Sequence, residues 1–318
     1  NMVSQEYVKK VITIFNQYPD IPLYLLPGNH DVLGAGCIYN RPIFSQISHL
    51  TILSKSDSIE VPDATLHPCP VYSKFSTQDS TKAISSVSGV EGIHIGVAHG
   101  SLEGKSPVPS WEGIDLPLDP LCVDRTGIDY LALGHWHSFR TFEDSKGIAR
   151  IAYSGTHEQT NYGEDNAGHC LLVQIAGKGD TPQIVPIKTG ELTWESREFE
   201  IRDSASLIDL EKYFESKKGI DMVRLVLYGE LPLEYQKDLN NILEFQSTMH
   251  KNFRVNRESL NISVPTQIDT LFDFGDPTLD RTDNYLKKLL ADEVDPMKKK
   301  IISEALAHLR KFGKEVDV

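Results

Sequence analysis

The sequence has few cysteines, and the four that it has, Cys37, Cys69, Cys122 and Cys170, form no C-x-x-C pair. A disulfide framework and a thiolate zinc site are therefore not indicated, and we expect buried free thiols. The sequence also lacks an apolar run close to the roughly 18 residues that a bilayer requires, and it has no basic stretch followed by an apolar one that would resemble a signal peptide. We therefore expect a cytoplasmic protein without a membrane partner.

Two nucleotide-binding motifs are absent as well. Neither GxxxxGK[ST] nor GxGxxG after a strand occurs, which argues against a P-loop NTPase or a dinucleotide enzyme. Positive charge is scarce, because 32 Lys and Arg residues stand against 45 Asp and Glu residues, for a net charge of -13. Since Lys and Arg supply most of the affinity for nucleic acid, the chain is not expected to hold a polyanion unaided. Bound dications or a basic partner would reconcile this charge with phosphate chemistry.

What the sequence does contain is an alternation of helical and strand patterns in a chain of 318 residues, long enough for two structural units. The spacing of Val8, Val11, Ile12 and Phe15 predicts a helix. Apolar, β-rich segments follow at 23–26, 93–99, 129–135, 149–155 and 169–177. Short strands that end in polar residues are typical of a layered α/β domain, which we expect over residues 1–194.

After about residue 195 the pattern predicts a small α+β capping domain over 195–264. A helix opened by Asp203 or Ser204 precedes the alternating strand "DMVRLVLYG", and a second helix carrying Leu239 precedes the strand-like "LNISV". The next segment, 265–282, is rich in Pro, Gly, Asp and Thr and is expected to be a linker. Its apolar residues Leu271, Phe272 and Phe274 could still dock on a surface.

The end of the chain, 283–318, is expected to be a helical tail. Asp295 and Pro296 form an N-cap and first-turn pair. The apolar stripe of the following helix is predicted at Ile302, Ala305, Leu309 and Phe312. An isolated helix cannot bury such a stripe, so the tail either docks on a partner or folds back on its own capping domain.

Three strand ends in the first part of the chain carry histidine: "PGNHD" at 27–31, "VAHGS" at 97–101 and "LGHWHS" at 133–138. Taken singly, each has a simpler explanation, because Gly, Asn and Asp favour turns and histidines are common in polar loops. Taken together, imidazoles and an Asn amide oxygen at parallel strand ends form a ligand set suited to manganese, iron or zinc.

The order GNH[DE], then a lone His at a strand end, then GHxH resembles the second half of the calcineurin-like metallophosphoesterase signature. The resemblance implies a β-sandwich flanked by helices, with two divalent metal ions, most simply Mn²⁺, at its top. Carried over residue by residue, it implies that Asn29, His99 and His135 bind one ion and that His137 binds the other.

The same resemblance assigns the catalytic role to the turn after the first strand. His30 would contact the scissile phosphate and protonate the leaving oxygen, and Asp31 would hold its ring. The D-x-H and G-D-x-x-D motifs that begin the signature do not occur in this sequence. Two explanations follow: a fragment that lacks an upstream segment, or a degenerate relative that starts at Met2. The intact later motifs favour the fragment.

The stretch after GHxH indicates which group within this superfamily the sequence resembles most. "IAYSGTHEQTNYGEDNAGHCLLVQI" (151–175) resembles the strand, turn and Glu-bearing loop of SbcD-type DNA exonucleases, in which a βαβαβ capping domain and tail helices follow. The resemblance implies a Mn²⁺-dependent DNA exonuclease or endonuclease in DNA repair, partnered by an SMC-like coiled-coil ATPase and possibly a homodimer. The alternatives are a phosphatase or nucleotide phosphodiesterase of the same chemistry, and a scaffold that tethers an ATPase and cuts nothing.

Overall fold

The computed structural model describes residues 3–34, 36–104, 116–216, 220–263 and 272–313. The chain divides into two compact units, Asn1–Glu191 and Leu192–Val318, and each contains both helices and strands. The mixed α/β class expected from the sequence is therefore confirmed, whereas the metallophosphoesterase sandwich stays a prediction. No helix in these described ranges combines the length and the apolar content needed to cross a bilayer.

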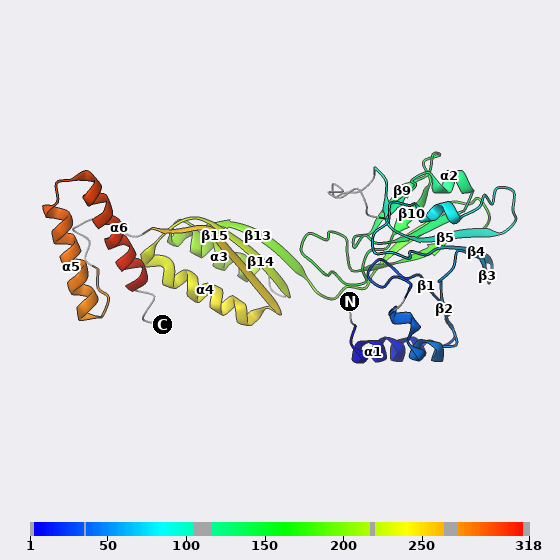
Figure 1. The fold of residues 1–318 in the computed structure, drawn as a ribbon, viewed down its shortest axis with the longest axis horizontal. Helices are drawn as coiled ribbons and strands as arrows, with labels where there is room; N and C mark the ends of the chain where they lie inside the picture. Colours follow the sequence, from blue (N-terminus) through cyan, green and yellow to red (C-terminus); the bar gives the residue numbers. More distant parts are fainter. Residues whose placement is uncertain (1–2, 35, 105–115, 217–219, 264–271, 314–318) are drawn as a thin grey trace. The chain divides into compact units, whose positions relative to one another are not determined.

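A mixed sheet forms the centre of the first unit (Figure 1). Its order in the described residues is β3 (Ile59–Val61), β4 (Ala64–Cys69), β5 (Ile93–His99), β8 (Tyr130–Gly134), β10 (Ala149–Tyr153) and β9 (Arg140–Glu143). The four inner strands are parallel, and the two outer ones pair antiparallel with their neighbours. Because the inner strands run the same way, their carboxyl ends meet at one edge of the sheet.

The inner strands are apolar because they are covered on both faces. Leu131 and Ile151 are fully buried and pack with Cys122 and Val123 of the short helix α2 (Cys122–Thr126). In a separate small cluster, Val8 and Ile12 of α1 (Gln5–Asn16) pack against a turn of 3-10 helix. This confirms the helix expected at the start of the chain.

Shorter elements complete the first unit. Strand β1 (Leu23–Leu25) pairs in parallel with β2 (Leu50–Ile52), and β11 (His169–Gln174) forms an antiparallel pair with β12 (Gln183–Lys188). The remaining elements are β6 (Ser101–Leu102), β7 (Pro117–Leu118), η1 (Ile38–Asn40), η2 (Pro42–Gln46) and η3 (Ser80–Ala83). Three of the cysteines are buried free thiols, as expected, but Cys170 is exposed, because alternate side chains of β11 face solvent.

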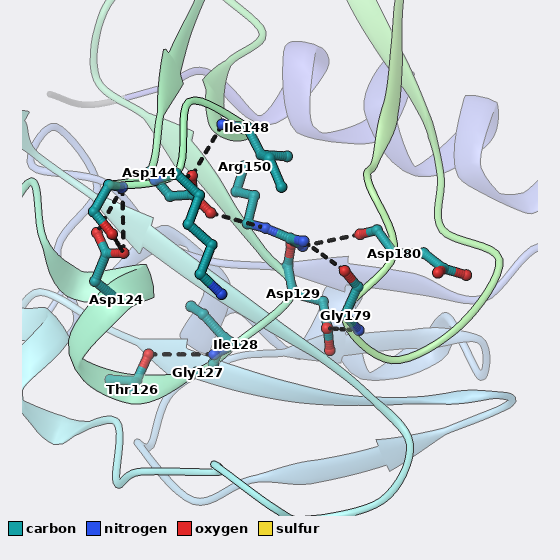
Figure 2. A network of polar contacts seen from close by, with 12 residues as sticks. Asp124, Thr126, Gly127, Ile128, Asp129, Asp144, Ile148, Arg150, Gly179 and Asp180 are labelled. Carbon is teal, nitrogen blue, oxygen red and sulfur yellow. Dashed lines mark hydrogen bonds and ion pairs between the residues drawn. The ribbon is translucent and has the colours of Figure 1, made fainter.

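The amino ends of β8 and β10 are tied together by a buried guanidinium (Figure 2). Arg150 donates to the carbonyl oxygens of Asp129, Gly179 and Asp180 at 2.7 to 2.9 Å and to the Asp144 carboxylate at 3.2 Å. Although burial raises the pKa of Asp144, hydrogen bonds from backbone N–H groups and from Arg150 outweigh it and hold that pKa below its usual range. The loops at this end of the sheet are therefore joined by charge-assisted hydrogen bonds.

The second unit begins with a βαβαβ segment: β13 (Trp194–Glu200), α3 (Ser204–Ser216), β14 (Met222–Pro232), η4 (Leu233–Tyr235), α4 (Gln236–Met249) and β15 (Asn252–Ser263). Asp203 begins α3 by accepting from the Ser206 N–H at 2.9 Å. The strands lie in the order β13-β14-β15 and are all parallel, so this part is of α/β rather than the expected α+β type. Each crossover is a helix because parallel neighbours cannot be joined by a tight turn.

Strand β14 shows why one face of this sheet is covered. Val223, Leu225 and Leu227 are fully buried in a cluster that also holds side chains of α3 and α4. The intervening Arg224 and Tyr228 are exposed, as the two-residue period of a strand requires. Both helices therefore pack on the same face of the sheet (Figure 1).

The chain ends in an antiparallel helical pair, α5 (Pro277–Asp292) and α6 (Pro296–Gly313) (Figure 1). The linker expected over 265–282 is therefore shorter, because α5 already begins at Pro277. Asp276 accepts from the N–H groups of Thr278 and Leu279, which is a helix N-cap, and proline suits the first helical position. The linker residue Leu271 lies outside the described residues.

The predicted apolar stripe of α6 is wrong in part. Ile302 and Leu309 are half-buried, but Ala305 and Phe312 are exposed, and the buried positions are Leu306, Arg310 and Gly313.

The buried face of α6 differs from the predicted stripe because of the residues that α6 contacts in α5 and in the segment before it. The Arg310 Nε donates to the buried Asp283 of α5 at 2.7 Å, and Lys287 also binds Asp283 at 2.7 Å. Phe274 is buried against Gly313, where a Cβ would lie 2.4 Å from its ring. The segment before α5 therefore docks on α6.

Candidate metal centre

Two of the predicted ligands meet at the carboxyl ends of β5 and β8. His99 is the last residue of β5 and pairs in register with Gly134, the last residue of β8, so His135 follows directly beside it. The Nδ1 of His135 lies 3.3 Å from the Nε2 of His99, and the two rings meet edge to face. The two strand ends thus bring one nitrogen of each imidazole close to the other.

The third predicted ligand comes from the turn after β1. Asn29 is 8% exposed, and its Oδ1 lies 3.0 Å from the Nε2 of His99. The turn is closed by Asp31, whose Oδ1 accepts from the Gly28 N–H at 2.7 Å and whose Oδ2 accepts from the Tyr39 hydroxyl. His30 is exposed, so the turn directs Asn29 inward and His30 towards solvent.

Glycine permits the close approach of these elements. A Cβ on Gly28 would lie 2.6 Å from the His99 ring, and one on Gly134 would lie 3.1 Å from it. Any larger residue at position 28 would displace His99, which is a close-approach role for glycine.

The backbone of His135 is strained. Its φ is 116°, a value that non-glycine residues rarely adopt. Strain of this kind costs about 1–3 kcal/mol and is found mainly at functional sites. The strain at His135 therefore points to a function for its side chain.

The residue between the two histidines of GHxH anchors this turn to the core. Trp136 stacks on Tyr153 with a centroid separation of 4.4 Å, and its Nε1 donates to Ser101 at 3.2 Å. The Tyr153 hydroxyl in turn donates to the Gly100 carbonyl at 2.6 Å, next to His99. One aromatic pair therefore braces both strand ends.

The two separations between donor atoms at His99 are those of neighbouring ligands on one metal ion. With metal–ligand bonds of roughly 2.1 Å, adjacent donor atoms lie about 3.0 Å apart in octahedral and about 3.4 Å apart in tetrahedral coordination. The separations at His99 are 3.0 Å to Asn29 and 3.3 Å to His135. In the parts of the chain that the structure describes, no group of three or more His, Cys, Asp and Glu residues could hold a metal. The cluster of Asn29, His99 and His135 has two such residues and an amide oxygen as its third donor.

The fourth predicted ligand, His137, is placed with a carboxylate. Its Nδ1 lies 2.6 Å from Glu164 Oε1, and its side chain is 52% exposed. Glu164 also accepts from the N–H groups of Thr160 and Asn161 at 2.7 and 2.9 Å. The predicted assignment of His137 to a second ion, like the roles of His30 and Asp31, stays a prediction.

Sequence reasoning missed two residues of this site. Glu164 lies within the Glu-bearing loop that the resemblance singled out, so the loop was predicted but not the pairing with His137. Tyr39 follows the GNHD turn by eight residues and carried no signal, because its contact with Asp31 depends on the path of the intervening chain. When compared with models of known families and with curated proteins, the chain matches none of them.

Proposed function

We propose that this protein is a hydrolase of the calcineurin-like kind, a metal-dependent phosphodiesterase that acts on DNA. The observation that carries the proposal is the convergence of Asn29 Oδ1, His99 Nε2 and His135 Nδ1 at ligand-like separations beside a strained backbone. If the cluster only stabilised the fold, a strained backbone at His135 would have no purpose.

Metal binding and proton transfer would be carried out by different residues. Asn29, His99 and His135 would hold one divalent ion, most simply Mn²⁺, and His137 would contribute to a second. When bound, such ions neutralise phosphate oxygens and make a coordinated water more acidic. His30 is exposed beside Asn29 and is the residue that would give a proton to the leaving oxygen, a task suited to imidazole near neutral pH.

DNA as substrate and a coiled-coil ATPase as partner rest on the SbcD-like order of segments. Residues 151–175 contain the Glu-bearing loop, and the βαβαβ segment and the α5–α6 pair follow in the order that the resemblance implies. The turn between α5 and α6 exposes Val294, and the first turns of α6 expose Met297 and Ile301 beside three consecutive lysines. An exposed apolar and basic surface suits a protein partner better than open solvent.

Metal binding and hydrolysis by the 318-residue chain test the proposal. Because D-x-H and G-D-x-x-D are absent from the sequence, we expect one tightly bound Mn²⁺ ion by calorimetry and elemental analysis, with slow hydrolysis of bis-nitrophenyl phosphate and single-stranded DNA. His99→Ala should abolish both. His30→Ala should keep the ion and reduce hydrolysis by about 10²-fold. His308→Ala, on the exposed face of α6, is the matched control and should change neither.

Two results would contradict parts of this proposal. Loss of metal in His30→Ala would make His30 a ligand rather than an acid. Hydrolysis of phosphoprotein or nucleotide substrates in preference to DNA would favour the phosphatase or nucleotide phosphodiesterase alternative.

A second candidate, a scaffold that tethers an ATPase without cutting, is favoured by one finding. The described residues contain no metal-binding group made of His, Cys, Asp and Glu alone. If the chain binds no Mn²⁺ at millimolar concentration but still co-purifies with a coiled-coil ATPase through residues 283–318, the scaffold is the better interpretation.

A further inference from the structure

Glu164 makes an unusually complete set of contacts for a loop carboxylate. Its Oε2 accepts from the backbone N–H groups of Thr160 and Asn161, and the Thr160 hydroxyl lies 2.9 Å from Oε1. The same Oε1 lies 2.6 Å from the Nδ1 of His137. The side chain is 15% exposed, so these contacts are mostly shielded from water.

The contacts suit an ionised Glu164, because both of its carboxylate oxygens accept hydrogen bonds: Oε2 from two backbone N–H groups and Oε1 from the Thr160 hydroxyl. Glutamate is ordinarily ionised at neutral pH. An ionised carboxylate only accepts hydrogen bonds, so the facing Nδ1 of His137 must carry a proton. In the neutral ring the lone pair then lies on Nε2, the other nitrogen.

We infer that Glu164 is a positioning residue for His137: it fixes the proton on Nδ1, reserves Nε2 for a metal ion, and makes binding at His137 depend on the 160–164 turn. A carboxylate that receives the second N–H of a histidine is the usual arrangement behind a metal-bound imidazole. The metal part of this inference rests on the function proposed above, whereas the tautomer part does not.

The loop that carries Glu164 is held at both ends. Glu158 accepts from the N–H groups of Gln159 and Glu191 at 3.0 and 2.8 Å, and the Thr189 hydroxyl donates to the His157 carbonyl at 2.6 Å. On the carboxyl side, the Phe139 N–H donates to the Asn166 carbonyl at 3.0 Å. A loop fixed in this way can hold a carboxylate in place, as a positioning role requires.

A purely structural role for Glu164 is the competing explanation. Its bonds to Thr160 and Asn161 alone would close the turn, and His137 would then be a passive neighbour. The two roles differ in what they do to the imidazole, so the state of the ring is the quantity to measure.

The first experiment reads the tautomer of His137 without any metal. Long-range nitrogen-15 spectra of the metal-free chain at pH 8.5, above the usual range of imidazole titration, should show His137 protonated at Nδ1. Glu164→Gln and Glu164→Ala should shift the ring towards the Nε2-protonated form that neutral histidine prefers in water. Asp165→Asn, at the exposed carboxylate next to Glu164, is the matched control and should leave the ring unchanged. An unchanged tautomer in both Glu164 variants overturns the inference.

The second experiment measures the weaker Mn²⁺ binding that we expect His137 to keep in a chain in which His99→Ala removes the tight binding by the first cluster. We expect Glu164→Gln to weaken this binding by about 10-fold, within the range known for carboxylates behind metal-bound histidines. Equal affinity in Glu164→Gln and Asp165→Asn overturns the metal part. If the parent chain binds no Mn²⁺ while the tautomer shifts as expected, the proposed function fails and the positioning of His137 by Glu164 stands.

Discussion

At the amino ends of β8 and β10, Arg150 gives its hydrogen bonds to four protein oxygens (Figure 2), whereas at the carboxyl ends of β5 and β8 the donor atoms of His99 and His135 face each other. The first end satisfies its polar groups within the protein. The second end brings potential ligand atoms together on a strained backbone. The same parallel strands therefore carry a stabilising end and, by our proposal, a binding end, and each should respond differently to substitution.

The largest expected effect is at the stabilising end. Arg150→Met removes the guanidinium that donates to the carbonyl of the buried Asp129, to the carbonyls of Gly179 and Asp180 and to Asp144 Oδ2. Breaking a buried ion pair by removing one partner costs about 3–5 kcal/mol. We expect the free energy of unfolding in urea to fall by that amount. The control Arg140→Met, at an exposed position of β9, should change it by less than about 0.5 kcal/mol. A small loss for Arg150→Met would mean that this end does not stabilise the unit.

The next effect concerns the strain at the binding end. Glycine adopts a φ of 116° without penalty, so His135→Gly should be about 1–3 kcal/mol more stable than His135→Ala in thermal or urea unfolding. His137 does not have a positive φ, and there the order should reverse, with His137→Gly about 0.5–1 kcal/mol less stable than His137→Ala. If the alanine variant were the more stable one at both positions, His135 would not be strained.

A third prediction concerns pH and a buried histidine pair in β4 and β5. His67 Nε2 lies 3.0 Å from His94 Nδ1, while Ser58 Oγ lies 3.0 Å from the other His67 nitrogen. His94 Nε2 lies 3.2 Å from the Glu91 carbonyl and must donate to it. The proton positions of the neutral rings are then fixed along this chain of contacts.

Burial, and after it the charge on His94, lowers the pKa of His67. The unfolded state therefore binds more protons, so stability is present above pH 6.5 and is lost as pH falls below it, by at most about 1.4 kcal/mol per pH unit for one group. Asp144 behaves differently, because a lowered carboxyl pKa retains its contribution until the pH falls below about 4. Urea unfolding between pH 7.5 and 5 should show the loss, His67→Gln should reduce it, and the control His308→Gln should not.

The smallest effect is at the turn that holds Asn29. Tyr39→Phe removes the hydroxyl that donates to Asp31, and a single such hydrogen bond contributes about 1 kcal/mol. We expect a loss of that size in unfolding free energy. Tyr72→Phe, at a largely exposed tyrosine, should cost less than about 0.5 kcal/mol. If both variants lose the same unfolding free energy, the hydrogen bond from Tyr39 to Asp31 does not stabilise the turn.

The sequence predicted the strand ends of the binding site, because apolar segments with a Gly or His at their ends mark both the strand and its termination. It placed His99 and His135 on one edge, and their register in parallel strands made them neighbours. It could not predict the pair His137 and Glu164, because the loop that joins them has no periodic pattern. Pairing of that kind is decided by tertiary packing.

The helical pair shows the same limit. The start of α5 at Pro277 was missed, although Asp276 and Pro277 repeat the N-cap pair that was recognised at Asp295 and Pro296. The buried face of α6 was missed as well, because Arg310 is polar in sequence and is buried against Asp283 of the other helix. The sequence of one helix does not show which residue of another helix will pair with its polar side chains and allow them to be buried.

The all-parallel order of β13, β14 and β15 has a kinetic consequence. Trp194 pairs with Met222, and Met222 with Asn252, so no two strands in this sheet are joined by a hairpin that could close first. Each pairing requires closure of a loop that contains a whole helix, which raises the mean sequence separation of contacts and slows folding. We therefore expect α3 and α4 to form before the sheet does. After dilution from denaturant, helical signal from this unit should then appear before its sheet is complete.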